Sequence, residues 1–253
     1  MNPALFWVGG GALLGLIIGS FLGALVMRWP REESVLRGRS HCDHCDRTLG
    51  VRDLVPVLSA LASRLRCRSC GARIDPVHLL MELGAAIIGA AAFGLATGPL
   101  AALGWCLLGW IVLALALLDA RHFWLPDALT LPLAFLGLTI GPFVTDASMP
   151  DRWIGAAVGY GALMAIALGY RALRGREGLG LGDAKLLGAI GAWTGWQALP
   201  FVLLIASVAA LGWAGVMALR GQAVDGASRL PLGTFLCLAM GPAMLVEAML
   251  LIG

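Results

Sequence analysis

Long apolar segments recur along this sequence, and they restrict the chain to one class of structure. A helix needs about 20 largely apolar residues to cross the hydrocarbon core of a bilayer, whereas a transmembrane strand alternates polar and apolar residues. The segments here are continuous, so the sequence predicts an all-α polytopic membrane protein of about eight transmembrane helices. The sixth segment is short and meets the seventh in a tight turn, so counts of seven or nine stay open. The eight segments are residues 4–27, 77–97, 100–118, 125–145, 153–172, 183–198, 199–219 and 232–252.

The low content of charged residues agrees with this interpretation. Only 13% of the residues are charged, against about 25% in soluble domains. The net charge of +3 comes from arginines in the loops, so it does not imply a nucleic-acid partner. Membrane lipid is the expected surrounding. The first apolar segment follows no charged region and precedes no small-residue cleavage pattern, so we expect it to be a retained helix.

The basic residues predict an orientation. Ten of the eighteen lie between residues 28 and 73. If the amino terminus is outside, alternating spans place every basic residue except Arg152 on the cytoplasmic side, as the positive-inside rule requires. Both termini are then on the outer side. The chain accordingly divides into a first transmembrane helix (1–27), a cytoplasmic insert (28–76) and a seven-helix membrane domain (77–253).

The insert contains two C-x-x-C pairs separated by 21 residues, which is the spacing of a four-thiolate zinc site. A cytoplasmic segment of about 50 residues with little apolar content cannot build much core, and a bound metal supplies folding free energy. We therefore expect a zinc-ribbon-like insert with structural Zn²⁺. Free thiol pairs or a redox pair are the alternatives, and His41 and His44 are possible replacement ligands. The four cysteines are Cys42, Cys45, Cys67 and Cys70.

Asp119 ends one predicted span and Asp183 begins another, 64 positions later. The alternating topology places both at the cytoplasmic face. Two neighbouring carboxyl groups can share a proton, so that one activates a water while the other binds a carbonyl, as in aspartic proteases. Gly180 and Gly182 would let a substrate backbone approach. The alternative is that Asp183 caps its helix and Asp119 faces lipid headgroups.

Three more polar residues are candidates for substrate binding. Glu82 lies in the second span, where it faces either the active site or a neighbouring helix. Lys185 either tunes the two aspartates or extends to lipid phosphate, and the second is favoured slightly. Asp127 begins the fourth span, where a capping role is also expected. A proton-coupled transporter that uses Asp119 and Asp183 as a relay is the alternative function, but the middles of the spans are nearly all apolar.

Several motifs together resemble the bacterial type IV prepilin peptidases. The resemblance extends over nearly the whole chain. The paired cysteines combined with both aspartate motifs are highly specific. The residues that resemble the family are "GSFLGALVMRWP", "RSHCDHC", "LVPVLSALASRLRCRSCGARI", "MELGAA", "LLDARHFWLPDALTLPL", "GLGLGDAKLLGAIGAWTGW" and "LPLGTFL".

This resemblance implies an aspartic intramembrane peptidase of the G-x-G-D type with Asp119 and Asp183 as the catalytic pair. Such enzymes of the bacterial inner membrane cleave a basic leader, after a glycine, from type IV prepilins or type II secretion pseudopilins. They then methylate the new amino terminus with S-adenosylmethionine. This chain has Leu232 and Thr234 where the family commonly has Phe and Pro, and we expect neither change to touch the aspartates.

Overall fold

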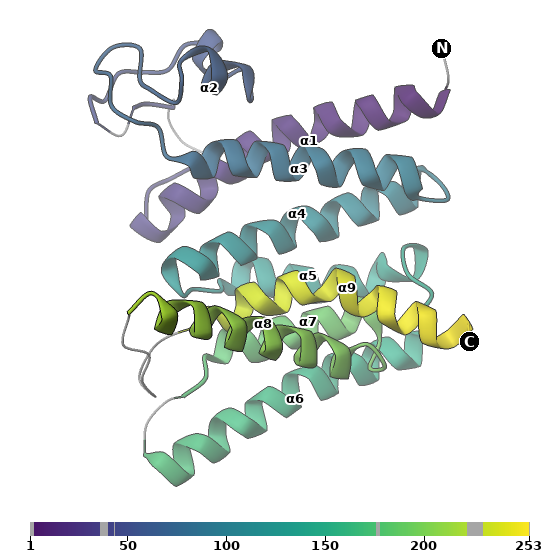
Figure 1. Ribbon diagram of the computed structural model, residues 1–253. Helices are drawn as coiled ribbons and strands as arrows, with labels where there is room; N and C mark the ends of the chain where they lie inside the picture. The colour runs from purple at the N-terminus through teal and green to yellow at the C-terminus, as the bar shows by residue number, and fades with distance from the viewer. Residues whose placement is uncertain (1–2, 36–39, 43, 176–177, 222–229, 253) are drawn as a thin grey trace. The chain divides into compact units, whose positions relative to one another are not determined.

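The computed structural model describes residues 3–35, 40–42, 44–175, 178–221 and 230–252. These residues form a helical protein (Figure 1) that divides into two compact units, Met1–Ala114 and Leu115–Gly253. Within the described ranges the only β-structure consists of two isolated bridges in the insert. The predicted all-α class is confirmed.

The first unit contains two long helices, most of a third, and the insert between the first two. The helices of this unit are α1 (Pro3–Arg28), α2 (Leu58–Ala62), α3 (Pro76–Leu95) and the larger part of α4 (Pro99–His122), with the 3-10 turns η1 (Trp29–Arg31) and η2 (Val51–Asp53). The second unit contains the end of α4, then α5 (Asp127–Thr139), η3 (Gly141–Phe143), α6 (Met149–Arg174), α7 (Leu181–Thr194), α8 (Leu199–Leu219) and α9 (Leu232–Ile252).

Six helices among the described residues are long and apolar enough to cross a membrane: α1, α3, α4, α6, α8 and α9. The other two predicted spans are helical but shorter than the sequence suggested. α5 has 13 residues and α7 has 14, which at 1.5 Å per residue is about 20 Å, against a hydrocarbon core of about 30 Å. The 3-10 turn at Gly141–Phe143 follows α5, and Gly195, with φ of 81°, follows α7.

Glycines allow α1 and α3 to pack with their backbones in contact. Gly11, Gly15 and Gly19 recur every four residues and so lie on one face of α1. A Cβ atom at Gly15 would collide with the carbonyl oxygen of Ala85, and one at Gly11 would collide with that of Gly89. Small residues at this spacing are typical of close helix pairs in membranes, where dispersion replaces the hydrophobic effect. This close packing organises the first unit.

α7 is the central helix of the second unit. Every residue from Leu186 to Thr194 is buried, and α5, α6 and α9 all pack against this helix. Contact with α6 again relies on glycine, because a Cβ at Gly191 would collide with the backbone of Gly155. A short helix with polar ends is tolerated at membrane depth when protein surrounds it.

Arg152, the one basic residue that the topology placed outside, is fully buried near the start of α6. Its guanidinium donates hydrogen bonds to carbonyl groups in the last turns of α5 and α7 and in the segment between α5 and α6. The carbonyls in the last turns, those of Gly137, Ala192 and Trp193, have no partner within their own helices, so the cation satisfies them and joins three helices. The oxygens are those of Gly137, Gly141, Thr145, Ala147, Ala192 and Trp193, together with the Thr145 hydroxyl.

Candidate active site and metal centre

Asp119 and Asp183 both lie at helix ends in the second unit. Asp119 is in the last turn of α4, where Phe123 ends the helix with a φ of 50° and donates its N–H to the Asp119 carbonyl. Asp183 is in the first turn of α7, after the extended N-cap residue Gly180. Asp is a common residue in the first turn of a helix, where it meets free N–H groups. Local structure alone therefore explains part of the placement of Asp183.

The two carboxyl groups are brought together despite their separation in sequence. Asp119 is 5% exposed and Asp183 is 9% exposed, and they lie close enough to interact electrostatically. Gly233, at the start of α9, lies beside the pair: a Cβ there would be 3.1 Å from Asp119 Oδ2, and its backbone acts electrostatically on both carboxyl groups. Residues from α4, α7 and α9 thus form one cluster, and its geometry favours a carboxyl pair over two separate helix caps.

Thr234 contacts Asp119 directly, and the expectation that its substitution would not touch the aspartates is wrong. Its backbone N–H donates to Asp119 Oδ2 at 2.7 Å, and its hydroxyl lies 3.1 Å from the same oxygen. The hydroxyl also lies 3.0 Å from the Ala116 carbonyl oxygen. A proline, common here in the family that the sequence resembles, has neither donor. The motif "LPLGTFL" was the only sequence signal for these contacts.

The two glycines before Asp183 have different neighbours. A Cβ at Gly180 would lie 3.0 Å from the Asp183 carboxylate. A Cβ at Gly182 would lie 2.9 Å from the Cβ of Leu125, so this side chain occupies the space that Gly182 leaves. The predicted role of both glycines in substrate approach stays a prediction.

Lys185 binds a carboxylate on the neighbouring helix. Its Nζ lies 2.7 Å from both carboxylate oxygens of Asp127, the first residue of α5. The sequence slightly favoured lipid phosphate as its partner, and the structure shows Asp127 in that place. Both side chains are partly exposed, so this ion pair contributes about 0–1 kcal/mol to stability. Its effect is to hold the start of α5 against the start of α7.

The four cysteines of the insert form one cluster. Their Sγ atoms all lie within 4.8 Å of one another, and those of Cys42 and Cys70 are 3.9 Å apart. Sulfurs around a tetrahedral zinc, with Zn–S near 2.3 Å, are about 3.8 Å apart. The donor set and spacing therefore fit a metal ion. All six cysteines lie among the described residues and form no disulfide, and His41 and His44 do not belong to the cluster.

Two similar turns build this metal centre. Gly71 follows Cys67 by four residues, has a φ of 72° and donates its N–H to the Cys67 carbonyl. Asp46 follows Cys42 in the same way, with a φ of 52°. Backbone N–H groups of Cys70 and Ser69 lower the pKa of the Cys67 thiol to about 6. A thiolate is the form that binds a metal.

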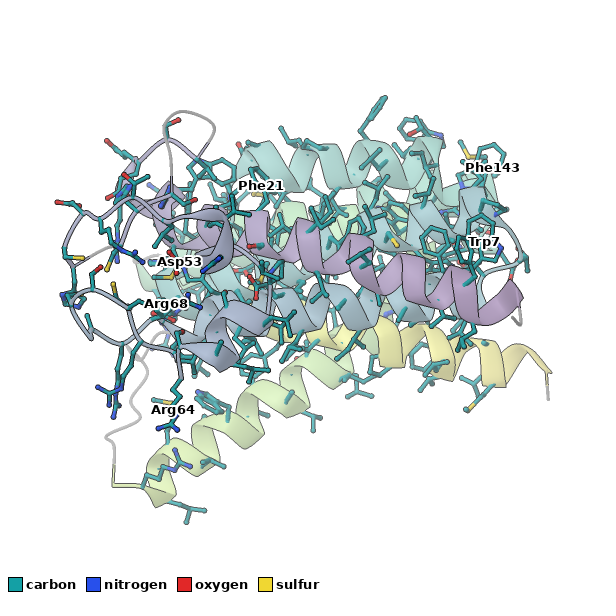
Figure 2. All side chains as sticks on the ribbon, turned by 90° about the horizontal axis from the view of Figure 1, so that it is seen from above. Trp7, Phe21, Asp53, Arg64, Arg68 and Phe143 are labelled. Atoms are coloured by element: carbon teal, nitrogen blue, oxygen red, sulfur yellow. The ribbon has the colours of Figure 1, made fainter. Side chains whose placement is uncertain are left out.

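Polar contacts complete the insert. Asp53 pairs with Arg47 at 2.8 Å and with Arg68 at 3.5 Å, and Figure 2 shows Asp53 and Arg68 together at the far end of α1 from Trp7. Glu82 on α3 is 7% exposed and accepts the Val57 N–H at 2.7 Å. Glu82 is therefore bound to the insert, which was neither of the two partners expected for it, the active site or a neighbouring helix.

A cavity of about 430 Å³ lies beside Glu82 in the first unit. Its lining includes Arg28, His78 and Cys67, together with residues of α1, α3 and the insert. Small-molecule sites usually measure about 300–1,000 Å³, so this cavity is large enough for a cofactor.

Comparison with known proteins gives consistent matches along the chain. Residues 13–95 match the model for the Bacterial Peptidase A24 N-terminal domain, and residues 106–215 match that for the Type IV leader peptidase family. A prepilin leader peptidase/N-methyltransferase of Stutzerimonas stutzeri is 36% identical over 92% of this chain and 88% of its own. Proteins with that name from Burkholderia pseudomallei strain 1026b and Pseudomonas aeruginosa are 40% and 34% identical, over 88% and 90% of this chain and 80% and 86% of their own. No solved structure matches significantly.

Proposed function

The chain belongs to the type IV leader peptidase family, and on that premise we propose that it is a prepilin leader peptidase of the bacterial inner membrane. Its substrates are type IV prepilins or type II secretion pseudopilins, cut at the cytoplasmic face. The single observation that carries the proposal is that Asp119 and Asp183, both buried at helix ends, lie close enough to interact, with Gly233 beside them. Nothing in the family or the relatives supports a proton-coupled transporter.

The chemistry follows from two carboxyl groups that share one proton. The ionised group accepts a proton from a water as the water oxygen attacks the scissile carbonyl carbon. The protonated group hydrogen bonds with the carbonyl oxygen and transfers its proton as negative charge develops there. A proton then passes to the amide nitrogen, the C–N bond breaks, and the mature amino terminus leaves. The Thr234 N–H holds Asp119 in place during these steps.

The direct test is cleavage of a prepilin by the purified protein in detergent, followed by mass spectrometry of the leader. Asp119→Asn and Asp183→Asn should each remove most of the activity, and the double variant should lose little more, because members of one catalytic unit are not additive. Asp151→Asn is the control, since Asp151 bonds with Trp196 beyond the other end of α7. Cleavage by Asp183→Asn at the wild-type rate would rule out the aspartic mechanism.

We also propose that the protein methylates the new amino terminus, as the names of its relatives suggest. S-adenosylmethionine is the proposed donor. Bound in this protein, it would supply the methyl group of its sulfonium to the new amino-terminal nitrogen, which would lose a proton. The cavity beside Glu82 has a suitable size, and a buried carboxylate can bind the donor's hydroxyl or amino groups. Binding of S-adenosylmethionine measured by calorimetry should weaken in Glu82→Gln if this location is correct, and equal affinity would exclude it.

For the metal centre we propose Zn²⁺, held by Cys42, Cys45, Cys67 and Cys70. Four thiolates favour zinc over hard cations, and the insert has a small apolar core. Since all four positions of a tetrahedral ion are occupied by protein, the proposed role is structural. Substrate contacts by Gly180, Gly182, Lys185, Asp127 and Glu82 remain part of the proposal.

A further inference from the structure

The segment that joins α4 to α5, residues 123–126 (the strap), passes beside both aspartates. Leu125 projects from it into the space left by two glycines. A Cβ atom at Gly233 would lie 2.7 Å from Leu125 Cδ1 and 3.1 Å from Asp119 Cγ, and a Cβ at Gly182 would lie 2.9 Å from Leu125 Cβ. Leu125 therefore contacts the backbone next to each of the two aspartates.

The strap is fixed on both sides of Leu125. Before it, Phe123 adopts the left-handed conformation and bonds with the Asp119 carbonyl. After it, Pro126 is buried and Asp127 binds Lys185, two residues beyond Asp183. The strap is thus tied to α4, which carries Asp119, and to α7, which carries Asp183. Independent contacts therefore hold Leu125 at this position.

The position of the strap determines which part of a substrate meets Leu125. This step rests on the proposed function, in which the leader lies on the cytoplasmic side of the membrane and the apolar mature segment lies in the bilayer. Asp119 is in the last turn of α4. The strap continues from that end of the helix, which the proposed topology places at the cytoplasmic face. A leader that approaches the aspartates from this side passes Leu125 immediately before the scissile bond.

We infer that Leu125 is the specificity-determining residue of the peptidase site, because its side chain limits the last leader residue to one without a side chain. The glycines at 182 and 233 do not leave open space for that residue, since Leu125 already fills it. A substrate residue with a Cβ must displace Leu125 or lie farther from the aspartates. One methyl group in a packed pocket typically changes kcat/KM by about 10- to 200-fold.

The experiment compares two prepilins that differ only in the last leader residue, glycine or alanine. Wild-type protein and Leu125→Ala are assayed in detergent, and kcat/KM is measured for each substrate. We expect Leu125→Ala to reduce the preference for glycine over alanine at least tenfold. Leu131→Ala is the matched control, because Leu131 is on the next helix and is 57% exposed. It should keep the wild-type preference.

Each result has one meaning. If the wild-type protein cleaves neither prepilin, the proposed function fails. If it cleaves the glycine substrate and Leu125→Ala changes both rates by the same factor, the inference about Leu125 is overturned while the function stands. If Leu125→Ala is inactive, Leu125→Val, which removes one carbon, decides the question. A reduced preference in that variant supports the inference, and an unchanged preference overturns it.

Discussion

The hydroxyl of Thr234 offers a sharp test of the active-site geometry. Thr234→Val keeps the shape of the side chain and the N–H that binds Asp119 at 2.7 Å, but it removes the hydroxyl 3.1 Å from Asp119 Oδ2. A hydrogen bond to a charged group contributes about 1.5–3 kcal/mol. At about 1.36 kcal/mol for each factor of ten in rate, kcat should fall by about 10- to 150-fold.

The hydroxyl has a single proton, so the structure allows two outcomes. If the proton is donated to Asp119, kcat falls as stated and KM changes little, because Thr234 acts through Asp119. If it is donated to the Ala116 carbonyl oxygen, 3.0 Å away, the variant loses stability but keeps its kcat. Thr234→Ser retains the hydroxyl and should remain within about threefold of wild type, since it loses only a methyl group.

The assay is steady-state prepilin cleavage, with thermal unfolding measured on the same samples. A Thr234→Val protein with a lower unfolding temperature and a wild-type kcat would refute a role for the hydroxyl at Asp119. A large loss of kcat in both Thr234→Val and Thr234→Ser would also refute it, because the serine variant keeps the donor.

Three further predictions concern the rest of the chain. Cys67→Ser should lower the zinc content measured by mass spectrometry, whereas Cys106→Ala, outside the cluster, should not; an equal zinc content in both would contradict the metal site. Gly15→Ala should lower the free energy of unfolding by about 1–3 kcal/mol through overpacking. Gly10→Ala, where the added Cβ would meet no atom of another helix within 4 Å, should have no such cost. Equal stabilities of the two variants would show that the backbones of α1 and α3 separate freely. A cysteine at residue 148 should react with an impermeant thiol reagent from the periplasm and one at 225 should not, and the reverse labelling would invert the topology.

The sequence was sufficient to predict the helices and to place Asp119 and Asp183 at helix ends, because each signal is local. Apolar runs predict helices wherever they occur, and Asp119 and Asp183 stand out in such runs. The sequence was less informative about the lengths of the helices. The helix α5 is short because a 3-10 turn follows it, and a hydropathy pattern does not distinguish a short apolar helix from a spanning one.

The contacts between helices could not be predicted from local patterns. Thr234 reaches Asp119 because the start of α9 meets the end of α4, and Leu125 lies near both aspartates because the strap packs against Gly182 and Gly233. The ion pair between Lys185 and Asp127 joins residues 58 positions apart. Each of these residues has an ordinary role when considered alone, as a polar helix start, a loop leucine or a surface charge. Only their positions in space give them a part in the site.

The burial of Arg152 changes how the charges of this chain are counted. The positive-inside rule counts basic residues on each side of the membrane, and it treats each arginine as a side chain that lies in the cytoplasm or contacts a lipid phosphate. Arg152 does neither, since its guanidinium serves as the shared cap of two short helices, α5 and α7. It belongs with the backbone hydrogen-bond network, as a bound water would. When Arg152 is left out of the count of basic residues, the predicted orientation has no lysine or arginine on the outer side of the membrane.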